Sequence, residues 1–345
     1  STIDGDLTLT SGNASGITDS GTVTVGGNLS ATTDANAGVI NLGTMAVDGT
    51  IALTTNSTGA ATIVNDAALT FAASTVGGAL TATATTGDIT DSGTLTITGA
   101  AIFKTGVDGS NIVLDSSSNA FSAAVTMIAD AGGEDFGNIT FVDSAAIDFA
   151  TSASSNGDLY INSSTDGTVG GNLSVTATTG NITDTVALAV AGTTTLVTSA
   201  DNATIDLGTA TNAFTGALTI TTNDSSGTDA DVTIDGGTTA LIIAASTIDG
   251  DLTLTSGHAS GITDSGTVTV GGNLAATTDD NNGVINMGTL AVDGTIALTT
   301  NGNGAATVVN DAGLAFAAST VTGALSATAT TGNITQSGAL TITGT

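Results

Sequence analysis

The sequence predicts an all-β protein, a parallel β-helix (β-solenoid) in which short strands stack coil upon coil. Three observations predict this fold. A stretch of 100 residues recurs 245 residues further on, short β-rich segments recur every 20–28 residues inside that unit, and apolar residues alternate with threonine or serine within the segments. A period of 20–50 residues is typical of stacked repeats, and a period of two is typical of a strand with one buried face.

The long repeat defines the organisation of the chain. Residues 1–100 align with residues 246–345 without a gap, and 83 of the 100 positions are identical. We therefore expect one continuous β-solenoid over residues 1–345, with a repeat unit at 1–245 and a partial second copy at 246–345. Such near-identity indicates recent tandem duplication, and we expect further copies beyond both ends. The start at Ser1 without an initiator methionine favours a fragment or a processed piece.

Ten shorter repeats, each opened by a β-rich segment, make up the 245-residue unit. They open with VTVGGN at Val23, MAVDGT at Met45, LTFAAS at Leu69, LTITGA at Leu95, AFSAAV at Ala120, IDFATS at Ile147, GTVGGN at Gly167, LAVAGT at Leu188, AFTGAL at Ala213 and LIIAAS at Leu241. VTVGGN then returns at Val268. The spacing predicts ten coils of about 20–28 residues each.

Strands and turns alternate within each short repeat. Runs such as DLTLT and TLTIT have the period of a half-buried strand, and Thr and Val favour strands by shape. Gly, Asn and Asp interrupt these runs and turn the chain. Hairpin sheets are a competing interpretation, but only a coil buries every apolar face and pairs every backbone group. The absence of proline fits strands that all lie in the sheet interior. Roughly 14 coils at about 4.8 Å each predict a rod of about 65–70 Å.

The composition excludes several classes of function. The chain has one Lys or Arg, 31 Asp or Glu, a net charge of −30 and no cysteine. This acid excess repels phosphate, so we expect no nucleic-acid partner and no anionic membrane surface. No apolar run reaches the roughly 18 residues that span a bilayer, so we expect no membrane insertion. Without cysteine there is no disulfide framework and no thiolate metal site.

Residues with catalytic potential are few. Glycan-cleaving β-helices rely on a base, an electrophile, paired carboxylates or a bound metal. The only histidine, His258, is replaced by Asn13 in the first copy, and the only lysine, Lys104, lies in an expected strand and turn. We expect both to be surface residues, and we expect no enzymatic activity.

A recurring Ile-Thr-Asp turn supplies four acidic residues, Asp19, Asp91, Asp184 and Asp264. They lie about three or four coils apart, which is roughly 15–19 Å, too far for a shared calcium ion. The second copy also replaces Asp91 with Gln336. We therefore expect turn residues that bond their own backbone.

Two longer loops are better candidates for calcium. Their hard oxygen ligands are Asp130, Glu134 and Asp135 in the first loop, and Asp224, Asp229 and Asp231 in the second. The spacing matches neither an EF-hand nor the nonapeptide of calcium-binding β-rolls. We expect no required cofactor, with calcium as the one candidate ion. Because the negative charges of neighbouring coils lie within the roughly 8 Å screening length, divalent cations should stabilise the coils.

Two similar segments carry a resemblance to a known family. SSNAFSAAVTM (Ser117 to Met127) and ATNAFTGALTITT (Ala210 to Thr222) resemble the N-x-F-x-G-x-(V/L)-(T/S) coils of filamentous-haemagglutinin-like adhesins. The Gly-, Thr-, Asn- and Asp-rich, cysteine-free background is also similar to autotransporter passenger stalks. The resemblance implies a right-handed β-helix, export across the outer membrane, and adhesion or filament formation at the bacterial cell surface. The secretion domain of that family is not recognisable in this chain.

A threonine-rich solenoid also raises the possibility of ice binding, which requires the same outward residue on successive coils. The compared positions are Thr24, Ala46, Thr70, Thr96, Asp148, Thr168 and Ala189. Because Ala and Asp interrupt this series, ice binding is the weakest of the functions considered.

Two other interpretations of function are better supported than ice binding. The first is a structural rod or filament segment of a very large extracellular protein, which associates with itself end to end or side by side. The second is an adhesin whose lateral face or longer loops bind glycans or neighbouring cells. Near-identical long repeats favour the rod, because a stalk requires only uniform stacking.

Overall fold

The structure is a computed structural model that describes residues 1–129, 137–150, 158–161, 168–208, 211–223 and 229–344. Within these ranges the regular elements are all β-strands, and the paired strands run parallel. The chain is an all-β solenoid with about 14 turns in total, as predicted. No helix in this part of the chain is long and apolar enough to cross a membrane.

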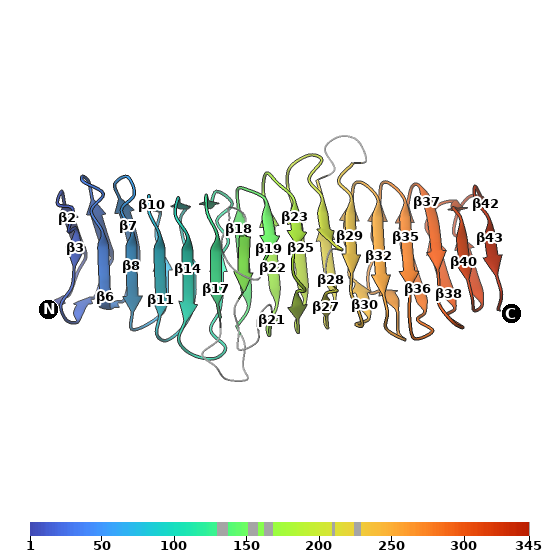
Figure 1. Cartoon of the computed structure of the whole chain (residues 1–345), viewed down its shortest axis with the longest axis horizontal. Coiled ribbons are helices and arrows are strands. Elements are labelled where there is room, and N and C mark those ends of the chain that lie inside the picture. Colours follow the sequence, from blue (N-terminus) through green and yellow to red (C-terminus); the bar gives the residue numbers. More distant parts are fainter. Residues whose placement is uncertain (130–136, 151–157, 162–167, 209–210, 224–228, 345) are drawn as a thin grey trace. The chain divides into compact units, whose positions relative to one another are not determined.

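The chain divides into two compact units, Ser1–Thr178 and Thr179–Thr345. Each unit is a stack of parallel coils (Figure 1). That the solenoid continues from one unit into the next remains a prediction, as does its handedness.

Unit 1 consists of 22 described strands, most of them two to five residues long. They are β1 (Thr2–Ile3), β2 (Leu7–Ser11), β3 (Ile17–Thr18), β4 (Val23–Val25), β5 (Leu29–Thr33), β6 (Ile40–Val47), β7 (Thr50–Thr55), β8 (Ala61–Asn65), β9 (Leu69–Phe71), β10 (Ser74–Val76), β11 (Leu80–Ala84), β12 (Ile89–Asp91), β13 (Leu95–Ile97), β14 (Ala101–Thr105), β15 (Ile112–Leu114), β16 (Ala120–Phe121), β17 (Val125–Ile128), β18 (Ile139–Asp143), β19 (Ile147–Phe149), β20 (Asp158–Ile161), β21 (Thr168–Val169) and β22 (Leu173–Ala177).

Unit 2 contains 21 described strands of the same kind. They are β23 (Ile182–Asp184), β24 (Ala189–Val190), β25 (Thr194–Thr198), β26 (Ile205–Leu207), β27 (Ala213–Phe214), β28 (Leu218–Thr221), β29 (Val232–Asp235), β30 (Leu241–Ile243), β31 (Ser246–Ile248), β32 (Leu252–Ser256), β33 (Ile262–Asp264), β34 (Val268–Val270), β35 (Leu274–Thr278), β36 (Ile285–Val292), β37 (Thr295–Thr299), β38 (Ala306–Asn310), β39 (Leu314–Phe316), β40 (Ser319–Val321), β41 (Leu325–Ala329), β42 (Ile334–Gln336) and β43 (Leu340–Ile342).

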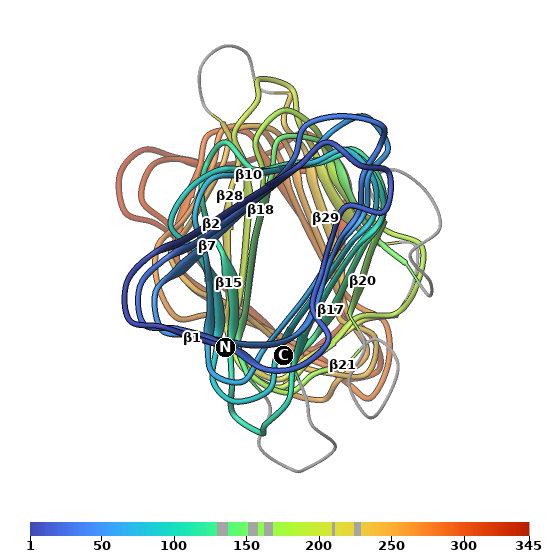
Figure 2. The same ribbon diagram turned by 90° about the vertical axis from the view of Figure 1, so that its left-hand side faces the viewer.

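Most strands pair with the equivalent strand of a neighbouring coil. β20 departs from this order, because it lies between β17 and β19 and Leu159 pairs with both Val125 and Phe149. Viewed end-on, β2, β7 and β15 of unit 1 lie in one wall, and β17 and β20 lie in the opposite wall (Figure 2). Leu29 pairs with Leu7 on one side and Ile51 on the other, so one turn there takes 22 residues. The number of residues per coil is close to the expected range at most positions. It reaches 34 between the paired residues Val125 and Leu159.

The two copies of the long repeat adopt the same strand register. Every strand pairing described within residues 1–100 recurs 245 residues later, as for Leu29 with Ile51 and Leu274 with Ile296. The same β-bulge also recurs, between Leu42 and Met45 in β6 and between Met287 and Leu290 in β36. The Leu–Met pair thus becomes Met–Leu, and all four side chains are buried. The exchange preserves the core volume at the bulge, as close packing requires.

The openings of the short repeats do not all lie at the same place in the coil. Val23 does pair with Met45, as expected. Leu69, however, pairs with Ile89, and Leu95 pairs with Ser74. The reason is that every wall of the coil has the same alternation of buried and exposed residues, so an apolar-polar pattern does not identify the wall.

The core of each unit is filled mainly by Leu, Ile, Val and Ala. In unit 1 four phenylalanines add a ladder of rings through successive coils. The ring centroids are 6.1 Å apart between Phe71 and Phe103, 6.0 Å between Phe103 and Phe121, and 5.2 Å between Phe121 and Phe141. The first two contacts are edge-to-face and the third is tilted, and aromatic pairs of this kind add to the free energy of burial.

Candidate functional site

The most regular polar feature is a ladder of Asp and Asn side chains at one exposed corner of the coil. The N–H of Asn28 donates to Asp6 Oδ1 at 2.7 Å, and Asn28 Oδ1 accepts the N–H and hydroxyl of Thr50 at 2.8 and 2.9 Å. The second copy forms the same ladder from Asp251 through Asn273 to Thr295. Each side-chain oxygen thus satisfies a backbone N–H where the strand begins.

A second ladder of the same kind continues through four coils of unit 1. Asp88 Oδ1 accepts the N–H of Asn111 at 2.7 Å, and Asn111 Oδ1 accepts that of Asn138 at 2.8 Å. Asn138 Oδ1 in turn accepts the N–H of Asn172 at 2.8 Å. These bonds connect coils directly, so the ladder gives the stack a structural function at its turns.

The four aspartates of the Ile-Thr-Asp turns also link coils. The Asp19 carboxylate accepts the N–H groups of Gly43 and Thr44 at 3.1 and 2.7 Å, and the Thr44 hydroxyl at 2.7 Å. Burial raises the pKa of Asp19, but these hydrogen bonds more than offset it and hold the pKa below its usual value. Asp264 makes the same contacts with Gly288 and Thr289.

The expectation that these aspartates bond their own backbone is incomplete, because Asp19 bonds its own backbone N–H and also the next coil. The Asp91 carboxylate accepts hydrogen bonds from the N–H of Asp115 at 2.9 Å and from the side-chain amide of Asn119 at 2.6 Å. The Asp184 carboxylate accepts one from the side-chain amide of Asn212 at 2.8 Å. In each of these bonds between coils the partner lies one coil away, because the turn places the carboxylate against the neighbouring strand.

Buried amides form a feature that the sequence reasoning missed. Asn65 is fully buried, and its side chain bonds both backbone groups of Val47 and the carbonyl of Ala68. Asn310 repeats these contacts with Val292 and Gly313. The signal was present in the strand ATIVN, where an asparagine follows Ala61 and Ile63 at an inward position.

One buried corner carries a carboxylate where neighbouring coils carry an amide. Asp143 is buried, and its Oδ1 accepts the N–H of Phe121 at 3.0 Å. In the same way, Asn119 Oδ1 accepts the N–H of Leu95 at 2.8 Å. Burial raises the pKa of Asp143 above its usual value, although backbone hydrogen bonds oppose the shift.

Only two of the six calcium candidates fall within the described residues; Asp130, Glu134, Asp135 and Asp224 lie outside them. The carboxylate of Asp229 faces the side-chain amide of Asn202. Asp231 Oδ1 accepts the N–H of Asp251 at 2.7 Å, which makes it part of the corner ladder. Among the described residues no three acidic or histidine side chains form a group able to hold a metal. Calcium binding therefore stays a prediction.

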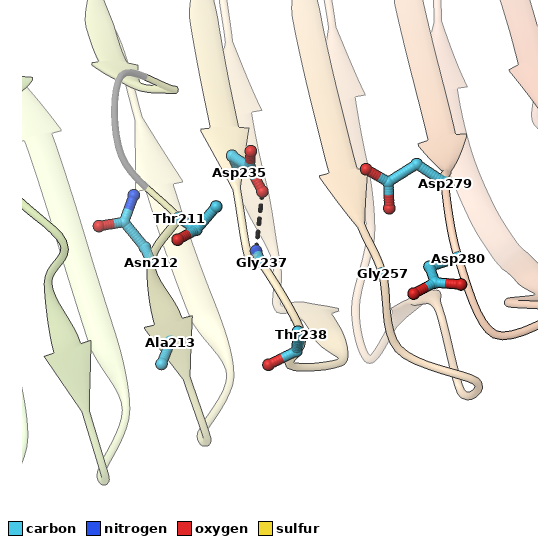
Figure 3. A pocket seen from close by; sticks show the side chains of 9 residues that line it. All are labelled: Thr211, Asn212, Ala213, Asp235, Gly237, Thr238, Gly257, Asp279 and Asp280. Atoms are coloured by element: carbon cyan, nitrogen blue, oxygen red, sulfur yellow. Dashed lines mark hydrogen bonds between the residues drawn. The ribbon is translucent and has the colours of Figure 1, made fainter.

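A surface hollow of about 290 Å³ in unit 2 collects three other carboxylates (Figure 3). It is lined by Thr211, Asn212, Ala213, Asp235, Gly237, Thr238, Gly257, Asp279 and Asp280. Asp235 Oδ1 accepts the N–H of Gly237 at 2.7 Å. A side chain at Gly257 would lie 3.2 Å from Asp279 Oδ1, so the glycine keeps this space open.

Neither His258 nor Lys104 lies in a catalytic arrangement in the described residues. His258 Nδ1 accepts the N–H of Ser260 at 3.0 Å, which is a turn contact. Lys104 lies on the outward face of β14 and is exposed. Both placements agree with the expectation of surface residues.

Four stretches of the chain match a single family model. The family is described as Repeats of unknown function (DUF5649), and the match covers residues 58–128, 136–221, 229–280 and 303–345, more than half of the chain. The chain belongs to this family. No curated protein and no solved structure matches it. The likeness to filamentous-haemagglutinin-like adhesins therefore remains a resemblance.

One outward column of this DUF5649 chain is occupied by threonine on five successive coils. In unit 1 the paired positions are Thr10, Thr32, Thr54, Thr75 and Thr96. In unit 2 they are Thr255, Thr277, Thr299, Thr320 and Thr341. The series compared at the sequence level mixed at least three columns, because Ala46 pairs with Thr24, Thr70 with Thr50, and Thr96 with Thr75.

The neighbouring column on the same wall is not uniform. It reads Thr8, Ser30 and Ala52 in unit 1, and Thr253, Ala275 and Ala297 in unit 2. Thr-x-Thr pairs therefore do not repeat from coil to coil. This second column, and not the interrupted series, disfavours an ice-binding face.

Proposed function

We propose that the chain is a non-enzymatic structural segment, part of a stalk or filament of a very large extracellular protein at the bacterial cell surface. The observation that supports this most strongly is the identical register of the two copies, bulge included. A solenoid repeat that keeps its register can be copied without a new interface, because each coil contacts only its neighbours.

The polar ladders support the same function. Aspartate and asparagine side chains bond the backbone of the next coil in both copies, so the turns as well as the strands resist separation of coils. Stacking of further coils would continue the pairing of backbone groups at each end of a stack. We therefore propose self-association, end to end or side by side, as the principal interaction, without a nucleic-acid partner or membrane insertion. Divalent cations such as calcium would strengthen it by reducing charge repulsion.

Negative-stain electron microscopy tests the structural function. A chain lengthened by one more complete 245-residue copy should form a rod longer by roughly 50 Å, about ten coils at 4.8 Å each, and of unchanged width. Millimolar calcium should leave the width unchanged and favour assembly. An added copy that forms a separate globule, or a particle that grows in width, would refute the proposal.

The adhesive alternative has one specific observation in its favour. The only tyrosine and the only lysine of the chain lie on the same outward sheet face of unit 1, beside an exposed isoleucine. A stalk requires none of these three side chains at the surface.

A further inference from the structure

The outward face of β8, β11, β14, β17 and β20, which we call the Tyr160 face, carries two columns of side chains. The first column contains Thr62, Thr81, Ile102, Thr126 and Tyr160, and the second contains Val64, Thr83, Lys104 and Ile128. Successive members of each column lie on adjacent strands of the sheet, about 4.8 Å apart. The face is therefore a continuous surface within unit 1.

The character of this face changes along the stack. At β8 and β11 it is Thr and Val, and the equivalent strands β38 and β41 of the second copy carry Thr, Ser and Val. From β14 onwards large side chains join the threonines, namely Ile102 and Lys104 on β14, Ile128 on β17 and Tyr160 on β20. Ile102 is 38% exposed, and Val107, just beyond the same strand, is 37% exposed. Large apolar groups that gather at a surface typically mark an interaction site.

The charge of the face selects one kind of partner. Lys104 is the only cationic side chain in a protein of net charge −30. An ammonium group attracts an isolated anionic group nearby, whereas the field of the whole chain repels a polyanion. The partner that fits is one with a single or sparse negative charge.

The dimensions of the face fit a short sugar chain. Tyr160 lies two coils from Ile102, a distance of roughly 10 Å, and Lys104 lies two residues further along its strand. An apolar ring face covers the CH groups of a sugar ring, and tyrosine combines such a surface with a polar hydroxyl. The hydroxyls of Thr81, Thr83 and Thr126 border the same area and both donate and accept hydrogen bonds.

We propose that the Tyr160 face binds an acidic glycan, with a sugar ring against Tyr160 and Ile102 and a sugar carboxylate at Lys104. This inference rests on the adhesive alternative and is independent of the structural function, which electron microscopy tests separately. A carboxylate paired with an ammonium group orients the sugar chain, and the apolar contact supplies the binding area.

A glycan array with neutral, uronic-acid and sialic-acid oligosaccharides, followed by calorimetric titration of the retained sugars, tests the proposal. The whole chain should retain carboxylated sugars and not their neutral counterparts. Lys104→Gln and Tyr160→Ala should each weaken binding at least tenfold, whereas Lys104→Arg and Tyr160→Phe should keep most of it. Val39→Ala removes an apolar side chain that is 36% exposed elsewhere in unit 1, and it should change nothing.

Each other outcome contradicts the proposal. Absence of carboxylated-sugar binding, or equal binding by Lys104→Gln, would overturn it. A dimer in sedimentation that dissociates on Lys104→Gln, without glycan binding, would assign the face to a second copy of the chain. Because Lys104→Gln alters one exposed side chain, its result stays informative even if Tyr160→Ala fails to fold.

Discussion

The side-chain amide of Asn65 pairs with the backbone of Val47 in the adjacent coil. Its Oδ1 accepts the Val47 N–H at 2.8 Å, and its Nδ2 donates to the Val47 carbonyl at 3.0 Å. The same amide also donates to the carbonyl of Ala68 at 2.7 Å. One buried side chain thus replaces the strand pairing that the bulge in β6 interrupts.

Replacement of this amide should be costly. Asn65→Ala leaves three buried backbone groups without partners, and we expect a loss of about 3 kcal/mol in the free energy of unfolding. Urea denaturation of the variant measures it. Asn310→Ala, the matched change in the second copy, should cost a similar amount, and a loss below about 0.5 kcal/mol at either site would contradict the assigned role.

Replacement of the buried hydroxyl of Thr194 should stabilise the folded protein. Thr194 is fully buried, and its Oγ1 has no hydrogen-bond partner. Thr194→Val removes this unsatisfied group at nearly constant shape, and we expect stabilisation of about 1 kcal/mol. Thr198 is the matched control on the same strand, because its hydroxyl donates to the Ala203 carbonyl at 3.1 Å. Thr198→Val should destabilise, and equal effects of the two changes would refute the distinction.

A turn with a left-handed backbone predicts a second stabilising substitution. Ala37 has a φ of 50°, and its counterpart in the second copy is Asn282, with a φ of 56°. Alanine is strained in this region and glycine is not, so Ala37→Gly should raise the melting temperature and stabilise by about 0.5–1 kcal/mol. Ala35→Gly, at an adjacent position outside this region, should not stabilise.

Asp143 should make stability depend on pH in an unusual direction. Because its folded pKa is raised above the unfolded value, the folded state binds the proton more tightly. Its unfavourable contribution is present in full above the folded pKa, and it disappears as pH falls below the unfolded value. Wild type should therefore gain stability relative to Asp143→Asn as pH falls from 7 towards 4. A carbon-13 titration of the Asp143 carboxyl with a midpoint at or below the ordinary value would contradict this.

Much of the architecture could be predicted because it depends on periodicity. The parallel solenoid and the approximate coil length follow from the repeats and from alternation in segments such as Leu7–Ser11. The position of Leu69 on its wall could not be predicted, because all walls share the same alternation. Register depends on how the turns close, and that requires the neighbouring coil.

The polar contacts were less accessible to sequence reasoning for the same reason. Asp19 was recognised as a turn residue, but its partner, Thr44, lies 25 residues away in the adjacent coil. The inward position of Asn65 could have been recognised from its strand, whereas its bond to Val47 depends on a bulge that no local pattern indicates.

The central claim is that both copies form coils of the same register, and spin-label distances test it most directly. The chain has no cysteine, so nitroxides attach only where cysteine is introduced. Thr10→Cys with Thr96→Cys, and Thr255→Cys with Thr341→Cys, place labels four coils apart within one unit. Pulsed electron–electron double resonance should give narrow and superimposable distributions, consistent with a backbone separation of roughly 19 Å. Distributions that differ between the two pairs, or that are broad in both, would contradict a shared register.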